Sequence, residues 1–182
     1  MEYIKKNIFL KKLQAAIDAK HLYHLIATSR RTLEEWLPSW SQIDSIDVLE
    51  AYIVKQEQSD FYWGEELYGI WRNDKLIGMV SLHSGQFDEK TVELSYFLGK
   101  DEGGKGSMTR ACTLLISKVF EERKIQSVII QCKTENIRSQ KLAERLGFEC
   151  LSSDLGLLVF VLHRSNWLKL KHSSLYFLWF RD

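Results

Sequence analysis

Hydrophobic and polar residues alternate over residues 91–98, and a period of about 3.6 takes over in residues 108–123. The first pattern predicts a strand with one face made of Val92, Leu94, Tyr96 and Leu98 and the other of Glu93, Ser95 and Phe97. The second predicts a helix with apolar positions at Met108, Ala111, Cys112, Leu115, Ile116, Val119 and Phe120. A glycine-rich segment therefore lies between a predicted strand and a predicted helix.

The first third of the chain is predicted to hold one strand and three helices, over residues 3–10, 13–28, 32–37 and 47–58. Pro38 is the only proline in the chain. It should end the second helix, because proline in a helix interior removes a hydrogen bond and clashes with the preceding turn. Asp44 or Ser45 is expected to cap the third helix.

The other strands are predicted over residues 67–72, 75–82, 91–98, 127–133, 157–162 and 174–180. Asn73 and Asp74 join the first two as a tight hairpin. After the strand at 127–133, Asn136 and Ser139 open a further helix that ends near Leu146-Gly147-Phe148. This order predicts an α+β fold, in which a mixed sheet is covered by helices on both faces.

The segment Gly103-Gly104-Lys105-Gly106-Ser107-Met108 is typical of loops that hold phosphates. Glycine accepts backbone angles that other residues avoid, so successive amides can turn toward one anion and the ligand can approach the main chain. A helix that starts at Ser107 or Met108 also directs its unpaired N–H groups and the positive end of its dipole at the loop. The segment therefore predicts an anion site.

Three interpretations of this loop compete. A Walker A motif counted from Gly99 places Gly106 where the Mg²⁺-binding hydroxyl is needed, so it fails. A dinucleotide fingerprint counted from Gly104 needs a glycine where Thr109 stands, so it fails as well. The third interpretation, a plain glycine turn between a strand and a helix, is not excluded by the loop sequence alone.

The order of strand, glycine loop, helix, strand, Asn-x-x-Ser helix and Leu-Gly-Phe resembles the core of the GCN5-related N-acetyltransferase (GNAT) superfamily, over roughly residues 75–149. The wording G-K-G-S-M-T-R-A, E-N-I-R-S and E-R-L-G-F is most similar to the Rim-type branch, which acetylates the N-terminal amines of ribosomal proteins. The resemblance implies a GNAT fold, with a mostly antiparallel central sheet, helices on both faces and a splayed strand pair that holds acetyl-CoA.

By this resemblance, amides of the glycine loop bind the pyrophosphate of acetyl-CoA, and the pantetheine arm lies along the end of the strand at 91–98. An N–H near Leu98 could also stabilise the oxyanion. Gly103 replaces the family's usual Gln or Arg, and Met108 its last small residue. The residues expected to bind the cofactor are Phe97, Leu98, Gly103, Gly104, Lys105, Gly106, Ser107, Met108, Thr109 and Asn136.

Acetyl transfer needs a deprotonated amine, a stabilised oxyanion and a partner for the leaving thiolate. Glu93 is the candidate general base, acting directly or through a water, with an ordinary polar strand position as the alternative. Ser139 is the candidate acid or water-positioning group, with a helix-start hydroxyl as the alternative. Ala143 stands where many members have a tyrosine. Trp36 and Trp40 resemble the branch's Trp-Leu-Pro element near the substrate cleft.

The composition limits the remaining choices. A chain of 182 residues with 45% hydrophobic residues predicts one domain over 1–182. The formal charge of +1 does not suggest a nucleic-acid partner, and no segment approaches the ~20 apolar residues of a membrane span. The N-terminus lacks the apolar core of a signal peptide. Three cysteines without metal-ligand spacing are read as reduced thiols without a metal, which fits the cytoplasm.

We therefore expect an acetyl-CoA-dependent N-acetyltransferase that acts on a primary amine, in first place a protein N-terminal α-amine. An α-amine, with a pKa of about 8, is easier to deprotonate than a lysine amine at about 10.4. A polyamine or aminoglycoside acceptor and a non-catalytic acetyl-CoA-binding protein are the alternatives. The segment 151–182 departs from the branch because it lacks the expected acidic and aromatic hairpin, and a dimer-forming edge, hence a homodimer, is one explanation.

Overall fold

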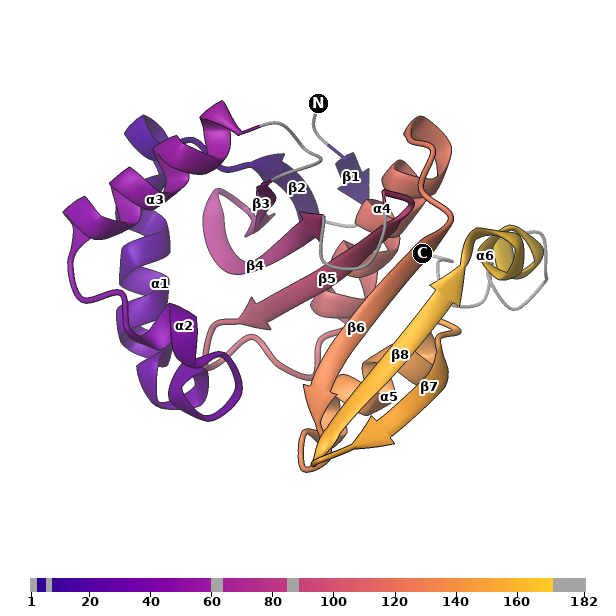
Figure 1. Cartoon of the computed structure of the whole chain (residues 1–182). Coiled ribbons are helices and arrows are strands. Elements are labelled where there is room, and N and C mark those ends of the chain that lie inside the picture. The colour runs from indigo at the N-terminus through magenta and orange to yellow at the C-terminus, as the bar shows by residue number, and fades with distance from the viewer. Residues whose placement is uncertain (1–2, 6–7, 60–63, 85–88, 172–182) are drawn as a thin grey trace.

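The computed structural model describes residues 3–5, 8–59, 64–84 and 89–171. Its strands form one eight-stranded sheet within these ranges, in the order β1-β2-β3-β4-β5-β6-β8-β7 (Figure 1). The strands are β1 (Tyr3–Lys5), β2 (Ile8–Lys12), β3 (Glu65–Arg72), β4 (Lys75–Ser84), β5 (Thr91–Leu98), β6 (Ser127–Lys133), β7 (Glu149–Asp154) and β8 (Leu157–His163). Neighbouring strands run antiparallel except β5 and β6, which are parallel.

Helices cover both faces of the sheet (Figure 1). They are α1 (Ala15–Trp36), α2 (Pro38–Ser41), α3 (Ile46–Gln58), α4 (Ser107–Glu122), α5 (Ile137–Arg145) and α6 (Arg164–Lys171). Buried residues of α1 to α3 pack with Leu67, Met79 and Phe97 on one face. Those of α4 and α5 pack with Leu94 and Val128 on the other. The mixed sheet with helices on both faces is therefore confirmed.

Local chemistry explains several element boundaries. Asn73 and Asp74 adopt φ angles of 46° and 63°, which suit a two-residue hairpin between twisted strands, as predicted. Ser45 caps α3, because its hydroxyl accepts a hydrogen bond from the Val48 amide at 3.3 Å. The strands predicted at 91–98, 127–133 and 157–162 correspond to β5, β6 and β8.

Two predictions about the N-terminal half are wrong. The strand expected over residues 3–10 is divided into β1 and β2, which pair with Lys5 opposite Ile8. The helices expected over 13–28 and 32–37 form the single helix α1, and Pro38 begins α2. Proline is accepted at a first helical position because the N–H that it lacks would have no helical partner there.

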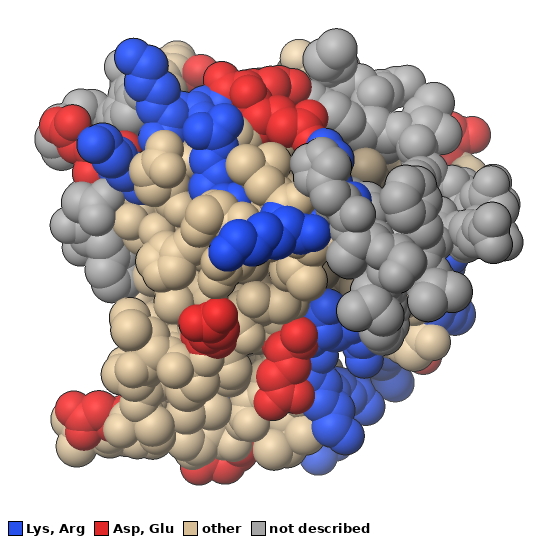
Figure 2. Space-filling view, turned by 90° about the vertical axis from the view of Figure 1, so that its right-hand side faces the viewer, with Lys and Arg blue, Asp and Glu red and all other residues tan. Residues whose placement is uncertain are grey.

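Strand β7 was missed by the hydrophobic pattern, for a physical reason. It is an edge strand, and all six of its residues are exposed, so no alternation of buried and exposed positions marks it. Leu151 is 68% exposed in the strand, and Leu155 is 98% exposed in the turn that follows. This side of the molecule is seen in Figure 2, where uncharged surface surrounds small groups of charged residues. The strand expected over 174–180 lies outside the described residues.

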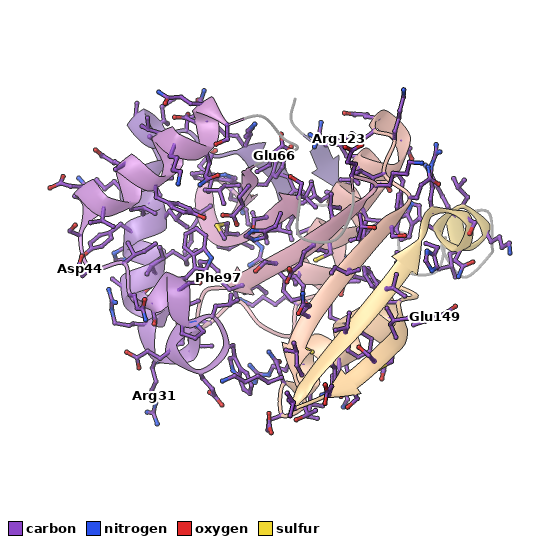
Figure 3. The ribbon with its side chains drawn as sticks, in the orientation of Figure 1. Arg31, Asp44, Glu66, Phe97, Arg123 and Glu149 are labelled. Atoms are coloured by element: carbon purple, nitrogen blue, oxygen red, sulfur yellow. The ribbon has the colours of Figure 1, made fainter. Side chains whose placement is uncertain are left out.

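Glu66 joins the sheet to the end of α4. Its Oε2 accepts a hydrogen bond from Arg123 Nη2 at 2.6 Å, and its Oε1 accepts one from Lys12 Nζ at 3.1 Å. Figure 3 shows Glu66 and Arg123 side by side at one end of the sheet. Burial raises the pKa of Glu66, but the charges of Arg123 and Lys12 outweigh it, so the net pKa is lowered.

Replacing Glu66 with Gln should therefore destabilise the fold by about 3 kcal/mol at neutral pH, because the largely buried ion pair between Glu66 and Arg123 is broken. The loss should shrink as the pH falls below ~4.3, since a carboxylate with a lowered pKa stabilises the folded state only while it is ionised. Urea unfolding between pH 3 and 7 measures both effects. Glu122→Gln, in an ion pair with Lys118 on the same helix, is the control and should cost under ~0.5 kcal/mol. An equal loss in both variants would contradict the assignment.

Candidate active site

The sheet is split where β5 and β6 separate. Their Cα atoms are paired at only three positions, which join residues Thr91 to Glu93 with residues Ser127 to Ile129. β5 then continues to Leu98 without this partner, although it stays paired with β4 throughout. Figure 1 shows the two strands diverging. Backbone groups on the open side of β5 can therefore hydrogen-bond a ligand that lies in the gap.

The glycine loop lies at the N-terminus of α4 and has the shape of an anion site. Gly104 and Gly106 have φ angles of 77° and 72°, a region that side chains disfavour. No atom lies within 4 Å of a Cβ placed on Gly103, Gly104 or Gly106. No side chain caps α4, so its first amides are open to a ligand. These features fit the pyrophosphate of acetyl-CoA.

Buried side chains hold this loop in place. The Glu102 carboxylate, 8% exposed, pairs with Arg72, with Lys75 at 3.5 Å and with Lys105 at 3.1 Å. Arg72 also donates a hydrogen bond to the Ser107 hydroxyl at 2.5 Å. Burial raises the pKa of Glu102, but the hydrogen bonds from Lys105 and Arg72 outweigh it and the net pKa is lowered. The loop is thus anchored by an ionised carboxylate beneath it.

The predicted cofactor residues near this loop differ in what their side chains do. Lys105 Nζ also donates a hydrogen bond to the Asp101 carbonyl at 2.9 Å, so its ammonium contacts the residues that precede the glycine loop. Thr109 Oγ1 accepts a hydrogen bond from Arg145 at 3.2 Å. Met108 is half-buried against the core on the α4 side. The groups of this segment that are left open to a ligand are therefore mainly its backbone amides.

Glu93 is the last residue of β5 that is paired with β6, and it belongs to a row of polar side chains. It is opposite His83 on β4, which is opposite Glu65 on β3. His83 Nε2 is 2.8 Å from Glu65 Oε1, and Gln131 on β6 donates to Glu93 Oε2 at 3.4 Å. Tyr52 on α3 donates a hydrogen bond to Glu65. Sequence reasoning missed Glu65, His83 and Tyr52, because only the strand register brings them to Glu93.

The row changes the acidity of its members. Burial raises the pKa of Glu93, and the charge of His83 and the hydrogen bond from Gln131 oppose this without cancelling it. Burial lowers the pKa of His83, but the hydrogen bond and charge of Glu65 outweigh it, so the net pKa is raised. A carboxylate with a raised pKa is a stronger base, which is what proton removal from an amine requires.

Ser139 lies on the opposite side of β5, at the start of α5. Its amide donates to Asn136 Oδ1 at 3.1 Å, so Asn136 caps the helix. Its hydroxyl is 2.7 Å from the Tyr96 hydroxyl, and burial raises the pKa of Tyr96. Sequence reasoning placed Tyr96 only on an apolar face, yet a buried tyrosine usually finds a hydrogen-bond partner, which is the signal that could have found this pair.

The two tryptophans of the expected substrate cleft have different environments. Trp40 is 5% exposed and packs on Tyr52 and Phe97, with ring centroids 5.6 and 6.1 Å apart. Trp40 therefore connects α2 to β5, the strand that borders the gap, through its contact with Phe97. Trp36 is half-buried at the last residue of α1. Next to it, the Glu35 carbonyl accepts a hydrogen bond from Lys133 Nζ at 3.0 Å, which joins the end of α1 to the end of β6.

The family model described as an acetyltransferase (GNAT) domain matches residues 7–149. The chain belongs to the GNAT family. It is an acetyltransferase whose acetyl donor is acetyl-CoA. The gap between β5 and β6 and the glycine loop are the candidate site for this donor. The GNAT fold predicted from the motifs is thereby confirmed.

Individual relatives support the Rim-type resemblance. YdaF of Bacillus subtilis (strain 168), a proposed ribosomal N-acetyltransferase, is 30% identical over 148 residues, which cover 80% of this chain and 79% of YdaF. The ribosomal-protein-serine acetyltransferase of Escherichia coli (strain K12) is 25% identical over 71% of this chain and 72% of its own. Among solved structures, RimL, a ribosomal L7/L12 acetyltransferase in complex with coenzyme A, has a TM-score of 0.78 to this chain. The match covers 88% of this chain and 96% of RimL at 16% sequence identity, and it shows the shared fold.

None of the helices that the structure describes is long and apolar enough to cross a membrane. The described part of the chain also holds no group of three or more His, Cys, Asp or Glu residues placed to bind a metal ion.

Gly106→Asn should raise the dissociation constant of acetyl-CoA at least about tenfold, because a side chain enters the open loop while asparagine tolerates positive φ. Isothermal titration calorimetry measures this constant. Gly156→Asn is the matched control, since Gly156 has a φ of 79° and open space around it in the β7–β8 turn. If Gly106→Asn binds acetyl-CoA as the control does, the loop is not the pyrophosphate site.

Proposed function

We propose that this enzyme transfers the acetyl group of acetyl-CoA to the α-amine at the N-terminus of a protein, with a ribosomal protein in the cytoplasm as the first candidate. The observation that carries the proposal is Glu93, a carboxylate with a raised pKa, at the point where β5 leaves β6. The names of the relatives from Bacillus subtilis and Escherichia coli support the same class of acceptor.

In this proposal Glu93 is the general base, acting directly or through one water. The acceptor amine arrives on the face of β5 that Glu93, Ser95 and Phe97 share, which is the face covered by α1 to α3. An α-ammonium with a pKa of about 8 loses its proton to such a carboxylate more readily than a lysine side chain at about 10.4. The proton then passes from Glu93 to solvent.

Ser139 serves the leaving thiolate from the other side of β5. Because burial raises the pKa of Tyr96, its phenol stays protonated at neutral pH and can donate to Ser139 Oγ. The hydroxyl proton of Ser139 is then left for a hydrogen bond to sulfur. Acetyl-CoA supplies the activated acetyl thioester, and backbone amides on the open side of β5 near Leu98 donate to the acyl oxygen.

The acceptor class is tested by thiol release from acetyl-CoA with a panel of amines. We expect turnover with peptides that carry a free N-terminal Ser, Ala or Met, and none with the same peptides after N-terminal blocking, even when they contain lysine. Mass spectrometry locates the acetyl group on the α-amine. Turnover restricted to a polyamine or an aminoglycoside would contradict the acceptor class. Thermal stabilisation by acetyl-CoA without turnover of any amine would instead support a non-catalytic binder.

Glu93→Gln should lower kcat about 10²- to 10⁴-fold, the usual contribution of a general base, and change acetyl-CoA affinity less than about twofold. Steady-state kinetics and calorimetry measure the two effects separately. Glu149→Gln, at an exposed position on β7, is the matched control and should keep full kcat. Full activity of Glu93→Gln would remove Glu93 from the mechanism.

A further inference from the structure

Glu65, His83 and Glu93 are successive partners across three antiparallel strands. Their Cα atoms are paired in register, and residues opposite one another in antiparallel strands project from the same face of the sheet. The row starts at a buried residue, since Glu65 is 5% exposed, and ends at the mouth of the gap between β5 and β6. His83 is thus placed between the carboxylates of Glu65 and Glu93.

The His83 ring is fixed from the buried end. Glu65 Oε1 lies 2.8 Å from His83 Nε2, and the Ser81 hydroxyl is 3.2 Å from the same nitrogen. Glu65 is itself held by hydrogen bonds to α3, from the Tyr52 hydroxyl to its carboxylate and from its amide to Gln56 Oε1 at 3.0 Å. A ring held by such contacts cannot turn away from Glu93 without breaking them.

We propose that His83, held by Glu65 and Tyr52, is a positioning residue for the Glu93 carboxylate. The inference rests on the proposed function, in which Glu93 accepts the proton of the acceptor amine. Without the ring, the buried charge of Glu65 would face Glu93 with no cation between them. Like charges at close range favour protonation of one of them, and a protonated Glu93 cannot act as a base.

The charges around the row support this role. Among the described residues, Glu65 acts on His83 from β3 and itself accepts a hydrogen bond from Tyr52 of α3. Glu93 acts on His83 from β5 and accepts a hydrogen bond from Gln131 of β6. The carboxylates raise the pKa of His83, so the ring is charged below neutral pH and lowers the pKa of Glu93 there. His83 keeps 30% of its side-chain surface exposed, whereas the Glu65 side chain keeps 5%.

The test compares pH profiles of kcat/KM for wild type, His83→Gln and His83→Lys. In the glutamine variant the acidic limb should move up by about one pH unit, because the cation that keeps Glu93 ionised is gone. Activity should therefore fall about tenfold on that limb and recover at higher pH. The lysine variant keeps a cation and should restore the limb. The acceptor amine titrates identically in all variants, so the shift reports on the enzyme.

A matched control and a double variant separate this role from a structural one. His163→Gln changes a histidine of β8 whose Nδ1 lies 3.0 Å from the Ser127 hydroxyl, and it should leave the profile unchanged. In a Glu93→Gln background, His83→Gln should cause no further loss of kcat. Equal loss at every pH, or additive losses in the double variant, would overturn the proposal.

A readout that needs no turnover distinguishes failure of this inference from failure of the proposed function. The pKa of His83, followed by NMR, should fall in Glu93→Gln, because one of the two carboxylates that stabilise the charged ring is removed, and stay constant in Glu149→Gln. If the pKa of His83 is the same in wild type and in Glu93→Gln, the two side chains are not coupled and the proposal is overturned. Intact coupling in a protein that turns over no amine would instead refute the acetyl transfer assigned to the site.

Discussion

The separation of β5 from β6 after Glu93 is the constraint on which the rest of the site depends. A sheet normally pairs every interior strand on both sides, and here one side of β5 loses its partner from Leu94 onward. Unpaired backbone groups inside a protein are costly unless a ligand or water satisfies them. The gap therefore supplies hydrogen-bonding groups for an extended ligand without requiring particular side chains. Glu93 and Ser139 lie on opposite faces of β5, because Ser139 contacts Tyr96 and successive side chains of a strand alternate between faces.

The glycine loop also offers a ligand mainly backbone groups and few side chains. Its amides and the first turn of α4 face a ligand, while the charged residues nearby hold the loop from below. Glu102 attracts Arg72 and Lys105, so the positive charges support the backbone instead of occupying the anion site. A loop held in its binding conformation loses little entropy when the donor binds.

The polar row shows how a buried sheet can carry charged groups. Glu65, His83 and Glu93 alternate in sign when the ring is protonated, and each carboxylate has further donors, Tyr52 for Glu65 and Gln131 for Glu93. Burial destabilises the ionised carboxylates, and their hydrogen-bond and charge partners offset this effect. The offset is complete for Glu65 and partial for Glu93. The balance leaves the pKa of Glu65 lowered and that of Glu93 raised, so one carboxylate is a fixed anion and the other a base.

The sequence by itself determined the local features: the two faces of β5, the start of α4 after the glycine loop, the Asn73-Asp74 hairpin and the serine cap of α3. These depend on residues close together in the chain, whose periodicity and backbone preferences act locally. Only the tertiary structure decided that His83 and Glu65 stand beside Glu93, that Tyr96 meets Ser139, and that an exposed edge strand follows α5. Strand register and sheet order set those contacts, and no local pattern encodes which distant residues become neighbours.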